Sequence, residues 1–296
     1  MKTKIVYVLT CREDDTTCAA MLALSLYTLR KRMRKVRDLE VLTVMDSFTH
    51  HVLEQCGSPV LSESTPVVVD PPPEYDQMSL SRYLKTSLRE IIQGDFLYID
   101  CDTMIADRLD EIDHLDANTD IAAVLDRNLE IRAEENDKAF EKCRKAGFLE
   151  LTNEIGFNGG VFFVRDTPVA HDFFRIWHDL WKKTLDRGVP YDQPALWETN
   201  RIMGHPIQRL SGVWNCQIAA RNNGAARYVR TVRILHYYSA YDGRILLSIL
   251  ERIRKKGKVS FFDAVLLRWP QSLVYIRRFA KSFWETRVAL RKKLKI

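Results

Sequence analysis

The sequence predicts an α/β fold whose strands are connected by helices, followed by a basic helical extension. Three observations lead to this prediction. Up to about residue 126, short runs of β-branched and aromatic residues alternate with amphipathic helical patterns. The hydrophobic run FLYIDCDTMI, residues 96–105, contains two aspartates separated by one residue. Residues 251–296 hold 14 Lys and Arg against 3 Asp and Glu, so basic residues dominate the end of the chain.

The first part of the chain is predicted to contain four strands and three helices. Glycine readily adopts the left-handed conformation that ends helices, and Gly57 and Gly94 are therefore expected to end two of them. Leu80, Leu84 and Leu88 share one face of the helix that leads into the aspartate-containing run. The expected strands are residues 4–10, 39–45, 65–69 and 95–100, and the expected helices are residues 16–35, 48–57 and 79–94.

The second part continues with the same two kinds of element. The segment at residues 167–188 is predicted to be a helix because Pro168 suits its first turn and Gly188 follows its end. Strands are expected at residues 120–126, 159–165, 206–211 and 229–236, with further helices at residues 133–147 and 193–202.

Composition points to a soluble protein of the cytoplasm. The chain has 296 residues, of which 46% are hydrophobic and 28% charged, and its six cysteines show no CxxC pair or zinc-ligand spacing. Five consecutive apolar residues near the start are too few for a signal peptide, and no stretch approaches the roughly 20 apolar residues of a membrane span. The glycine-rich phosphate-binding motifs GxGxxG and GxxxxGK[ST] are also absent from the sequence.

The two aspartates at residues 100 and 102 suit a divalent metal ion. In an extended strand, side chains two residues apart share a face, so Asp100 and Asp102 are expected on one side, about 7 Å apart at Cα, with Cys101 on the other. Paired carboxylates at the carboxyl end of a parallel strand are typical ligands of Mg²⁺ or Mn²⁺, which can bridge them to a diphosphate. Alternatively, Asp102 only caps the segment that follows.

Haloacid-dehalogenase-like phosphatases are an alternative because they also carry D-x-D on a strand. In that class the first aspartate is the nucleophile, and the motif continues to Thr or Val at its fifth position. Here Met104 occupies that position and Thr103 lies one place early. About 95 residues of α/β pattern precede the motif, whereas the class usually has it near the start of the domain.

Four motifs in order resemble those of metal-dependent glycosyltransferases. They are FLYIDCDT, GFNGGVFFVR at residues 156–165, YDQPAL at residues 191–196 and RILHYY at residues 233–238. Together they are similar to glycosyltransferase family 8 and related nucleotide-diphospho-sugar transferases, which include bacterial lipopolysaccharide glycosyltransferases. The resemblance covers roughly residues 4–240 and implies the GT-A fold, a Rossmann-like mixed sheet flanked by helices. It divides the chain into a catalytic domain, residues 1–244, and a basic tail, residues 245–296.

The resemblance implies a metal site made of three side chains. Asp100, Asp102 and His236 would bind Mn²⁺, or Mg²⁺, and Asp100 would also lie near the ribose of a UDP-sugar donor. An imidazole ligand suits Mn²⁺ better than Mg²⁺. His236 could instead be an ordinary half-buried histidine.

The same resemblance assigns the donor and catalytic residues. Asn158 would hydrogen-bond the donor sugar or the acceptor, Asp192 would accept sugar hydroxyls, and Gln193 would lie near the anomeric carbon. Against these roles stand a tight turn before a strand for the FNGG segment and a helix N-cap for Asp192. The remaining assignments are basic contacts to the donor from Arg82 and Lys85, nucleoside contacts from Thr10 and Cys11, and a sugar-hydroxyl acceptor or catalytic carboxylate at Asp126.

One departure from the family lies after the metal histidine. Family 8 commonly has H-x-x-G-x-x-K-P-W there, and HYYSAYDGR lacks that lysine and tryptophan, so Arg244 would be the substitute phosphate contact. The implied reaction is transfer of a hexose from a UDP-sugar to a hydroxyl of a glycan or glycolipid, with retained anomeric configuration, in synthesis of a cell-surface polysaccharide such as lipopolysaccharide. A non-catalytic sugar-nucleotide or glycan binder of the same fold is the alternative from another class.

The basic tail predicts attachment to a membrane surface. Residues 251–296 have a net charge of +11, whereas residues 1–250, with 31 basic and 36 acidic side chains, have −5. A helix over residues 270–296 would be amphipathic, with apolar residues along one stripe, which suits an anionic bilayer. We therefore expect residues 250–296 to hold a cytoplasmic protein on the inner face of the membrane, near lipid-linked glycan acceptors. Packing on the domain is an alternative, and the acidic body argues against a nucleic-acid partner.

Overall fold

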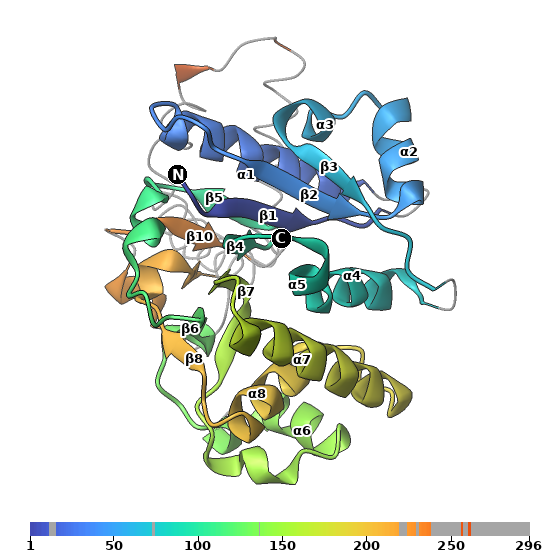
Figure 1. Ribbon diagram of the computed structural model, residues 1–296, viewed down its shortest axis with the longest axis vertical. Coiled ribbons are helices and arrows are strands. Elements are labelled where there is room, and N and C mark those ends of the chain that lie inside the picture. The colour runs from blue at the N-terminus through green and yellow to red at the C-terminus, as the bar shows by residue number, and fades with distance from the viewer. Residues whose placement is uncertain are drawn as a thin grey trace, which may run out of the picture.

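The computed structural model describes residues 1–11, 16–72, 75–135, 137–218, 224–228 and 231–237, together with residues 256, 260 and 261. In these parts of the chain a mixed sheet lies between two layers of helices (Figure 1). Arg244 lies outside the described residues, as does the predicted tail at residues 245–296 apart from those three positions.

The central sheet has seven strands in the order β3-β2-β1-β4-β7-β6-β8. The strands β1 to β4 are parallel to their neighbours in this group, whereas β7 is antiparallel to both β4 and β6. Helices connect the parallel strands β1 to β4, as predicted. The strand β7 lies inside the sheet and runs in the opposite direction. The bounds are β1 Lys4–Val8, β2 Val41–Met45, β3 Thr65–Val68, β4 Phe96–Ile99, β6 Ile121–Leu125, β7 Phe157–Val164 and β8 Ile207–Arg209.

Alternating side chains of the strands build a separate core on each face of the sheet. In β1, Val6 and Val8 pack with the helices α4, α5, α7 and α8, whereas Ile5 and Tyr7 pack with α1 and its neighbours. Both sets are buried, which explains why the strand reads as a continuous hydrophobic run. The helices are α1 Thr17–Met33, α2 Ser47–Gln55, α3 Val60–Glu63, α4 Gln77–Thr86, α5 Leu88–Ile91, α6 Asp137–Lys145, α7 Pro168–Asp186 and α8 Gln193–Ile202.

The prediction of a single helix at residues 79–94 is wrong, because the structure has two helices, α4 and α5, in this segment. The chain leaves helical geometry at Ser87, with φ −93° and ψ 1°, so α4 ends and α5 begins there. The Thr86 hydroxyl donates to the Arg82 carbonyl at 2.8 Å and also contacts the His178 ring at 2.7 Å. Such side-chain bonds compete with the backbone bonds of a helix and are typical of its end. Asp76 caps the start of α4, where its carboxylate accepts from the Ser79 N–H at 2.8 Å.

A second, three-stranded sheet in the order β5-β10-β9 was predicted only in part. The strand β10, Ile234–His236, falls within the expected range, but β5, Thr103–Ile105, and β9, Cys216–Gln217, are too short for a period-two pattern. The strand β10 is antiparallel to β5, and His236 is the Cα partner of Thr103. This pairing brings residue 236 directly beside the two aspartates.

The charged helix predicted at residues 133–147 is shorter in the structure. A 3₁₀ turn, Ala133–Glu135, precedes α6, and a second 3₁₀ segment, Leu149–Asn153, follows it. Further 3₁₀ turns are Asp110–His114, Asp126–Asn128, Gly212–Trp214 and Ala225–Arg227.

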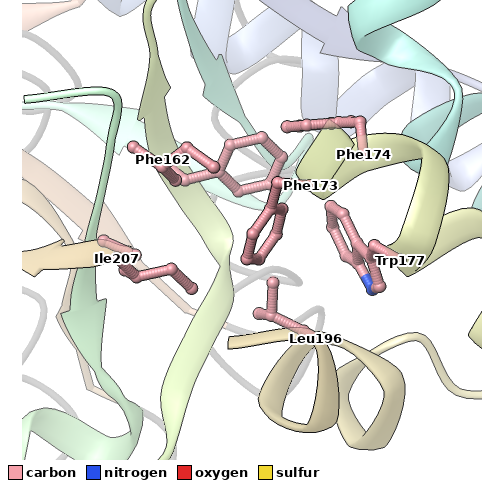
Figure 2. Close-up of a pocket in the computed structure, with 8 residues that line it drawn as sticks. Phe162, Phe173, Phe174, Trp177, Leu196 and Ile207 are labelled. Atoms are coloured by element: carbon pink, nitrogen blue, oxygen red, sulfur yellow. The ribbon is translucent and has the colours of Figure 1, made fainter. Parts of the chain in front are cut away.

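An apolar pocket lies between the sheet and the helices α7 and α8 (Figure 2). Aromatic and aliphatic side chains from both layers line it, and its lining atoms suit packing rather than phosphate binding. The labelled lining residues are Phe162, Phe173, Phe174, Trp177, Leu196 and Ile207.

Three indole N–H groups next to this core hold backbone carbonyls of the loops around it. Trp177 donates to the Asp192 carbonyl at 3.0 Å, and Trp181 donates to that of Pro190 at 3.2 Å. Trp197, on α8, donates to the Phe157 carbonyl at 2.7 Å. The tryptophans that fill the core therefore also fix the segment before α8 and the start of β7.

In the described part of the chain, we find no helix with the length and apolar character needed to span a bilayer.

We expect Trp177→Phe to lower the free energy of unfolding by about 1–3 kcal/mol, because the Asp192 carbonyl loses its buried donor. Urea unfolding followed by circular dichroism measures this loss. Phe173→Leu, in the same pocket, is the control that removes ring volume without removing a hydrogen-bond donor. A Trp177→Phe protein with the wild-type urea midpoint would contradict the role of the indole.

Candidate metal and donor-sugar site

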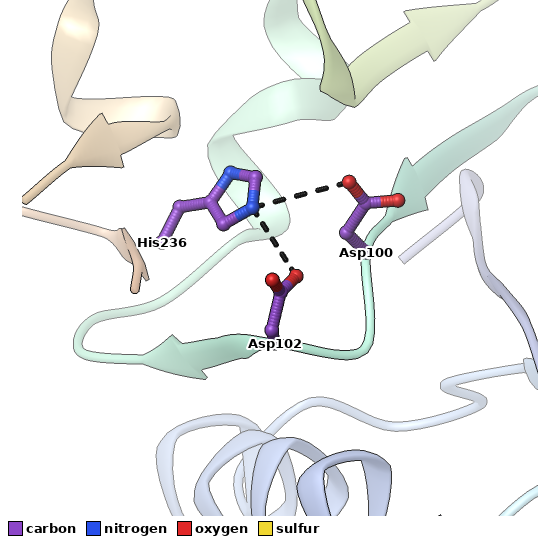
Figure 3. A group of neighbouring side chains, drawn as sticks. All are labelled: Asp100, Asp102 and His236. Atoms are coloured by element: carbon purple, nitrogen blue, oxygen red, sulfur yellow. Dashed lines mark ion pairs between the residues drawn. The ribbon is translucent and has the colours of Figure 1, made fainter. Parts of the chain in front are cut away.

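Asp100, Asp102 and His236 form one cluster at the carboxyl end of β4 (Figure 3). His236 Nε2 lies 3.2 Å from Asp102 Oδ1 and 3.9 Å from Asp100 Oδ2. The expectation that both aspartates extend one strand is wrong, since β4 ends at Ile99 and both residues lie in the bend before β5. The bend still turns both carboxylates toward the histidine, while Cys101 faces the other way and donates to the Val8 carbonyl at 3.1 Å.

Burial and mutual charge shift the pKa values of all three groups. Burial raises the pKa of Asp100 above its usual value, against the opposing effect of Lys85. Burial would also raise the pKa of Asp102, but His236 beside it holds that pKa below the usual value. For His236, burial favours the neutral ring, yet Asp102 and Asp100 raise its pKa overall. The charged form of Asp102 is thus favoured by its partner, whereas burial of Asp100 outweighs the effect of Lys85.

Lys85 joins the aspartate pair to the DQ segment. Its ammonium lies 3.7 Å from Asp100 Oδ1, 3.0 Å from Asp192 Oδ2 and 5.1 Å from the centre of the Tyr98 ring. Arg82, one turn earlier on α4, has its Nε 3.9 Å from Asp192 Oδ1. Because Lys85 is only 8% exposed, its charge is directed into the site rather than to solvent. Two residues predicted from the sequence as donor contacts therefore belong to the same cluster as the metal-ligand candidates.

Asp192 does not act as a side-chain cap. It precedes α8, but its carboxylate makes no capping hydrogen bond in the structure and is paired with the two cations of α4 instead. Lys85 and Arg82 overcome the effect of burial and hold the pKa of Asp192 below its usual value. Asp192 is thus the N-cap residue of α8 by position, with Pro194 in the first turn as predicted, but its side chain serves the ion pairs instead of the cap.

Asn158, Asp126 and Gln193 come together beside this cluster. Asn158 lies inside β7, so the alternative of a tight turn before a strand is wrong. Its Nδ2 donates to Asp126 Oδ1 at 3.2 Å, and Gln193 also hydrogen-bonds the Asp126 carboxyl. Burial raises the pKa of Asp126, and these two hydrogen bonds oppose that rise. Two residues from separate motifs, Asn158 and Gln193, therefore bond to the buried carboxyl group of Asp126.

Thr10 and Cys11 lie at the end of β1 and are both buried. The Cys11 N–H donates to Thr49 Oγ1 of α2 at 2.9 Å. This bond occupies the Cys11 N–H, which is one of the backbone groups predicted to contact a nucleoside. The bond ties Cys11 to α2.

Two residues of the site, Tyr98 and Asn215, were not singled out from the sequence. Tyr98 donates its hydroxyl to Asp100 Oδ1 at 2.5 Å, and burial raises the pKa of that hydroxyl well above its usual value. Its position on β4, two residues before Asp100, was a usable signal. Asn215 contacts His236, and its position carries no sequence signal. Gly160 packs on the His236 ring, in agreement with the close backbone approach expected of the FNGG glycines.

The donor set fits a divalent ion. Two carboxylates and one imidazole offer ligand atoms that all lie within 4.8 Å of one another, which is a hard oxygen set with one nitrogen. Glycine is required next to them, because a Cβ at Gly160 would overlap His236 and lie 2.7 Å from Asp100 Oδ2. The residues present are thus compatible with Mn²⁺ or Mg²⁺.

The chain has a GT-A-like glycosyltransferase fold. An active-site mutant of LgtC, in which glutamate replaces a glutamine, superposes with a TM-score of 0.57 at 16% identity, over 84% of this chain and 95% of LgtC. Mouse xyloside xylosyltransferase 1 gives 0.54 at 14% identity, over 80% of this chain and 98% of that protein. The bifunctional glycosyltransferase WbbM gives 0.53 at 16% identity, over 80% of this chain but only 45% of WbbM.

By sequence, no protein-family model and no curated protein matches the chain. The structural likeness, at these low identities, establishes the fold alone. It confirms the predicted fold class and gives no support to the phosphatase alternative.

We expect Gly160→Ala to abolish or weaken Mn²⁺ binding by at least about tenfold, because its methyl group would displace His236 and Asp100. The matched control is Gly159→Ala, whose methyl group would lie 3.4 Å from Lys85 Nζ, at ordinary contact distance. Titration calorimetry with Mn²⁺ gives the affinities, and circular dichroism checks the fold. Equal Mn²⁺ affinity in the two variants would count against the placement of the site.

Proposed function

We propose that the protein is a metal-dependent glycosyltransferase that moves a hexose from a UDP-sugar to a hydroxyl of a glycan or glycolipid. The observation that carries this proposal is that Lys85 contacts two charged clusters at once. On one side lies the Asp100, Asp102 and His236 cluster, and on the other lies Asp192 with Arg82. A UDP-sugar also has two adjoining parts, a diphosphate and a sugar. The metal-ligand cluster suits the diphosphate, and Asp192 suits the hydroxyls of the sugar.

The residues of the chain divide the work between the two ends of the donor. When bound, Mn²⁺ or Mg²⁺ would be held by Asp100, Asp102 and His236 and would supply positive charge to the leaving diphosphate. Lys85 and Arg82 add positive charge beside it, which stabilises charge that develops as the sugar bond breaks. Tyr98 holds the Asp100 carboxylate in place through its 2.5 Å hydrogen bond.

The sugar end would be recognised by acceptor and amide groups. Asp192 is buried, and we expect the sugar hydroxyls to donate to it. Asp126, Asn158 and Gln193 form the adjoining wall, and we propose Gln193 and Asp126 as the groups nearest the anomeric carbon. LgtC likewise has a glutamine in its active site. A retained anomeric configuration is part of the proposal.

The proposed cellular role places this catalytic domain, residues 1–244, on the inner face of the cell membrane. The support is the composition of residues 251–296, whose net charge of +11 suits anionic lipid. Arg244 is proposed as a further phosphate contact. The acceptor would then be a lipid-linked glycan in the synthesis of lipopolysaccharide or another surface polysaccharide.

Titration calorimetry with UDP tests the proposal directly. We expect UDP to bind in the presence of Mn²⁺ and to lose most of its affinity in EDTA. Asp102→Asn should weaken the Mn²⁺-dependent binding by about tenfold or more, because a charged ligand is replaced by a neutral one. UDP-sugars are then screened for slow hydrolysis. If the wild-type protein binds no UDP either with Mn²⁺ or with EDTA, the proposed function is refuted.

Asp192→Asn should separate sugar recognition from nucleotide binding. We expect turnover of the UDP-sugar to fall by at least about tenfold, since the charge-assisted hydrogen bonds to the sugar are weakened. Affinity for Mn²⁺ and UDP should stay close to wild type, because Asp192 is not a member of the metal cluster. Asp172→Asn, at an exposed aspartate on α7, is the control. Unchanged turnover in Asp192→Asn would refute the assignment.

A further inference from the structure

A chain of buried side-chain amides leads from the His236 ring to the wall of the sugar site. His236 Nδ1 lies 3.0 Å from Asn215 Oδ1, and Asn215 Nδ2 donates to Asn158 Oδ1 at 2.8 Å. Asn158 in turn donates to Asp126. Asn215 is fully buried at 0% exposure, and His236 is 1% exposed, so solvent does not compete for these bonds.

One backbone N–H group fixes the direction of every hydrogen bond in this series of side chains. The Gly160 N–H, which can only donate, points at Asn158 Oδ1 at 2.9 Å. The Asn158 oxygen is therefore an acceptor, and the group of Asn215 that meets it must be the NH₂ donor. The other end of the Asn215 amide is then its oxygen, which faces His236. Nδ1 of the ring must carry the hydrogen in order to bond this oxygen.

Asn215 itself is anchored by a second set of bonds with equally fixed directions. The Asn215 carbonyl accepts from Asn128 Nδ2 at 2.7 Å, and Asn128 Oδ1 accepts from the Gln217 N–H at 2.8 Å. The Gln217 side chain is held by the Arg127 N–H at 2.7 Å and by the Leu125 carbonyl at 3.0 Å. These bonds hold the backbone of Asn215 in place, while the contacts with Asn158 and His236 orient its side-chain amide.

We propose that Asn215 is a positioning residue that selects the tautomer of His236. With the hydrogen held on Nδ1, the Nε2 lone pair of the neutral ring is directed at the carboxylates, 3.2 Å from Asp102 and 3.9 Å from Asp100. That is the atom a metal ion would need. This inference rests on the proposed function, because it concerns the orientation of a candidate metal ligand.

A pair of substitutions at position 215 tests the acceptor role. Asn215→Leu has a similar size but cannot accept from Nδ1, so Mn²⁺ affinity should fall by about tenfold or more. Asn215→Asp keeps an oxygen toward the ring but loses the donor to Asn158, so its Mn²⁺ affinity should fall by at least about threefold less than that of the Leu variant. Affinity is measured by electron paramagnetic resonance of free Mn²⁺. The control is Asn200→Leu, a buried asparagine whose oxygen instead accepts from the Ile207 N–H.

A spectroscopic readout on the wild-type protein does not depend on the folding of a variant. Long-range ¹H–¹⁵N correlation of the metal-free protein, at a pH where His236 is neutral, should give the shift pattern of the Nδ1–H tautomer. The Nε2–H pattern in wild type would overturn the inference. Unchanged Mn²⁺ affinity in Asn215→Leu, or an equal loss in the Leu and Asp variants, would overturn it as well while the proposed function stands. A wild-type protein that binds no Mn²⁺ would instead refute the metal-dependent function, and the inference with it.

Discussion

The site depends on the compensation of three closely spaced carboxyl groups by nearby cations. Asp100 and Asp102 follow β4 and Asp192 precedes α8, and the removal of such groups from water costs several kcal/mol per ion unless each is paired. His236 and Lys85 supply the nearest positive charge, and Lys85 serves both groups of carboxylates at once. A ligand that brings its own cation, such as a metal-bound diphosphate, could share in this compensation. The buried lysine thus connects protein stability to the chemistry proposed for the site.

The antiparallel strand β7 brings the separate motifs into contact. It runs between β4 and β6, so Asn158 and Gly160 face the end of β4 rather than the opposite edge of the sheet. The Gly160 carbonyl accepts from the Asp100 N–H at 2.8 Å, which ties the bend of the aspartates to this strand. The absence of a side chain at Gly160 leaves the space that the His236 ring fills. Gly160 therefore holds the backbone of Asp100 through a hydrogen bond and also leaves room for the His236 side chain.

The rigidity of the site comes from bonds with an unambiguous donor. The indole of Trp177 holds the carbonyl of Asp192, and that of Trp197 holds the start of β7. Backbone N–H groups fix the amides of Asn158 and Asn128 in the same way. Because a buried polar group that loses its partner costs about 1–3 kcal/mol, each of these bonds disfavours alternative orientations. Pre-organised groups of this kind suit a site that must stabilise charge as it develops.

The sequence by itself determined the elements whose pattern is local. Hydrophobic periodicity and end signals predicted β1, α1, α7 and α8 closely, and motif order predicted the GT-A fold and named the metal candidates. It could not show that Ser87 divides a helix, that the aspartates lie in a bend, or that Asp192 pairs with Lys85 instead of capping α8. It also missed Asn215, which meets His236 because β9 pairs with β10 and β10 pairs with β5. Only the tertiary structure decided these contacts, since they join residues far apart in the chain and depend on register, burial and hydrogen-bond direction.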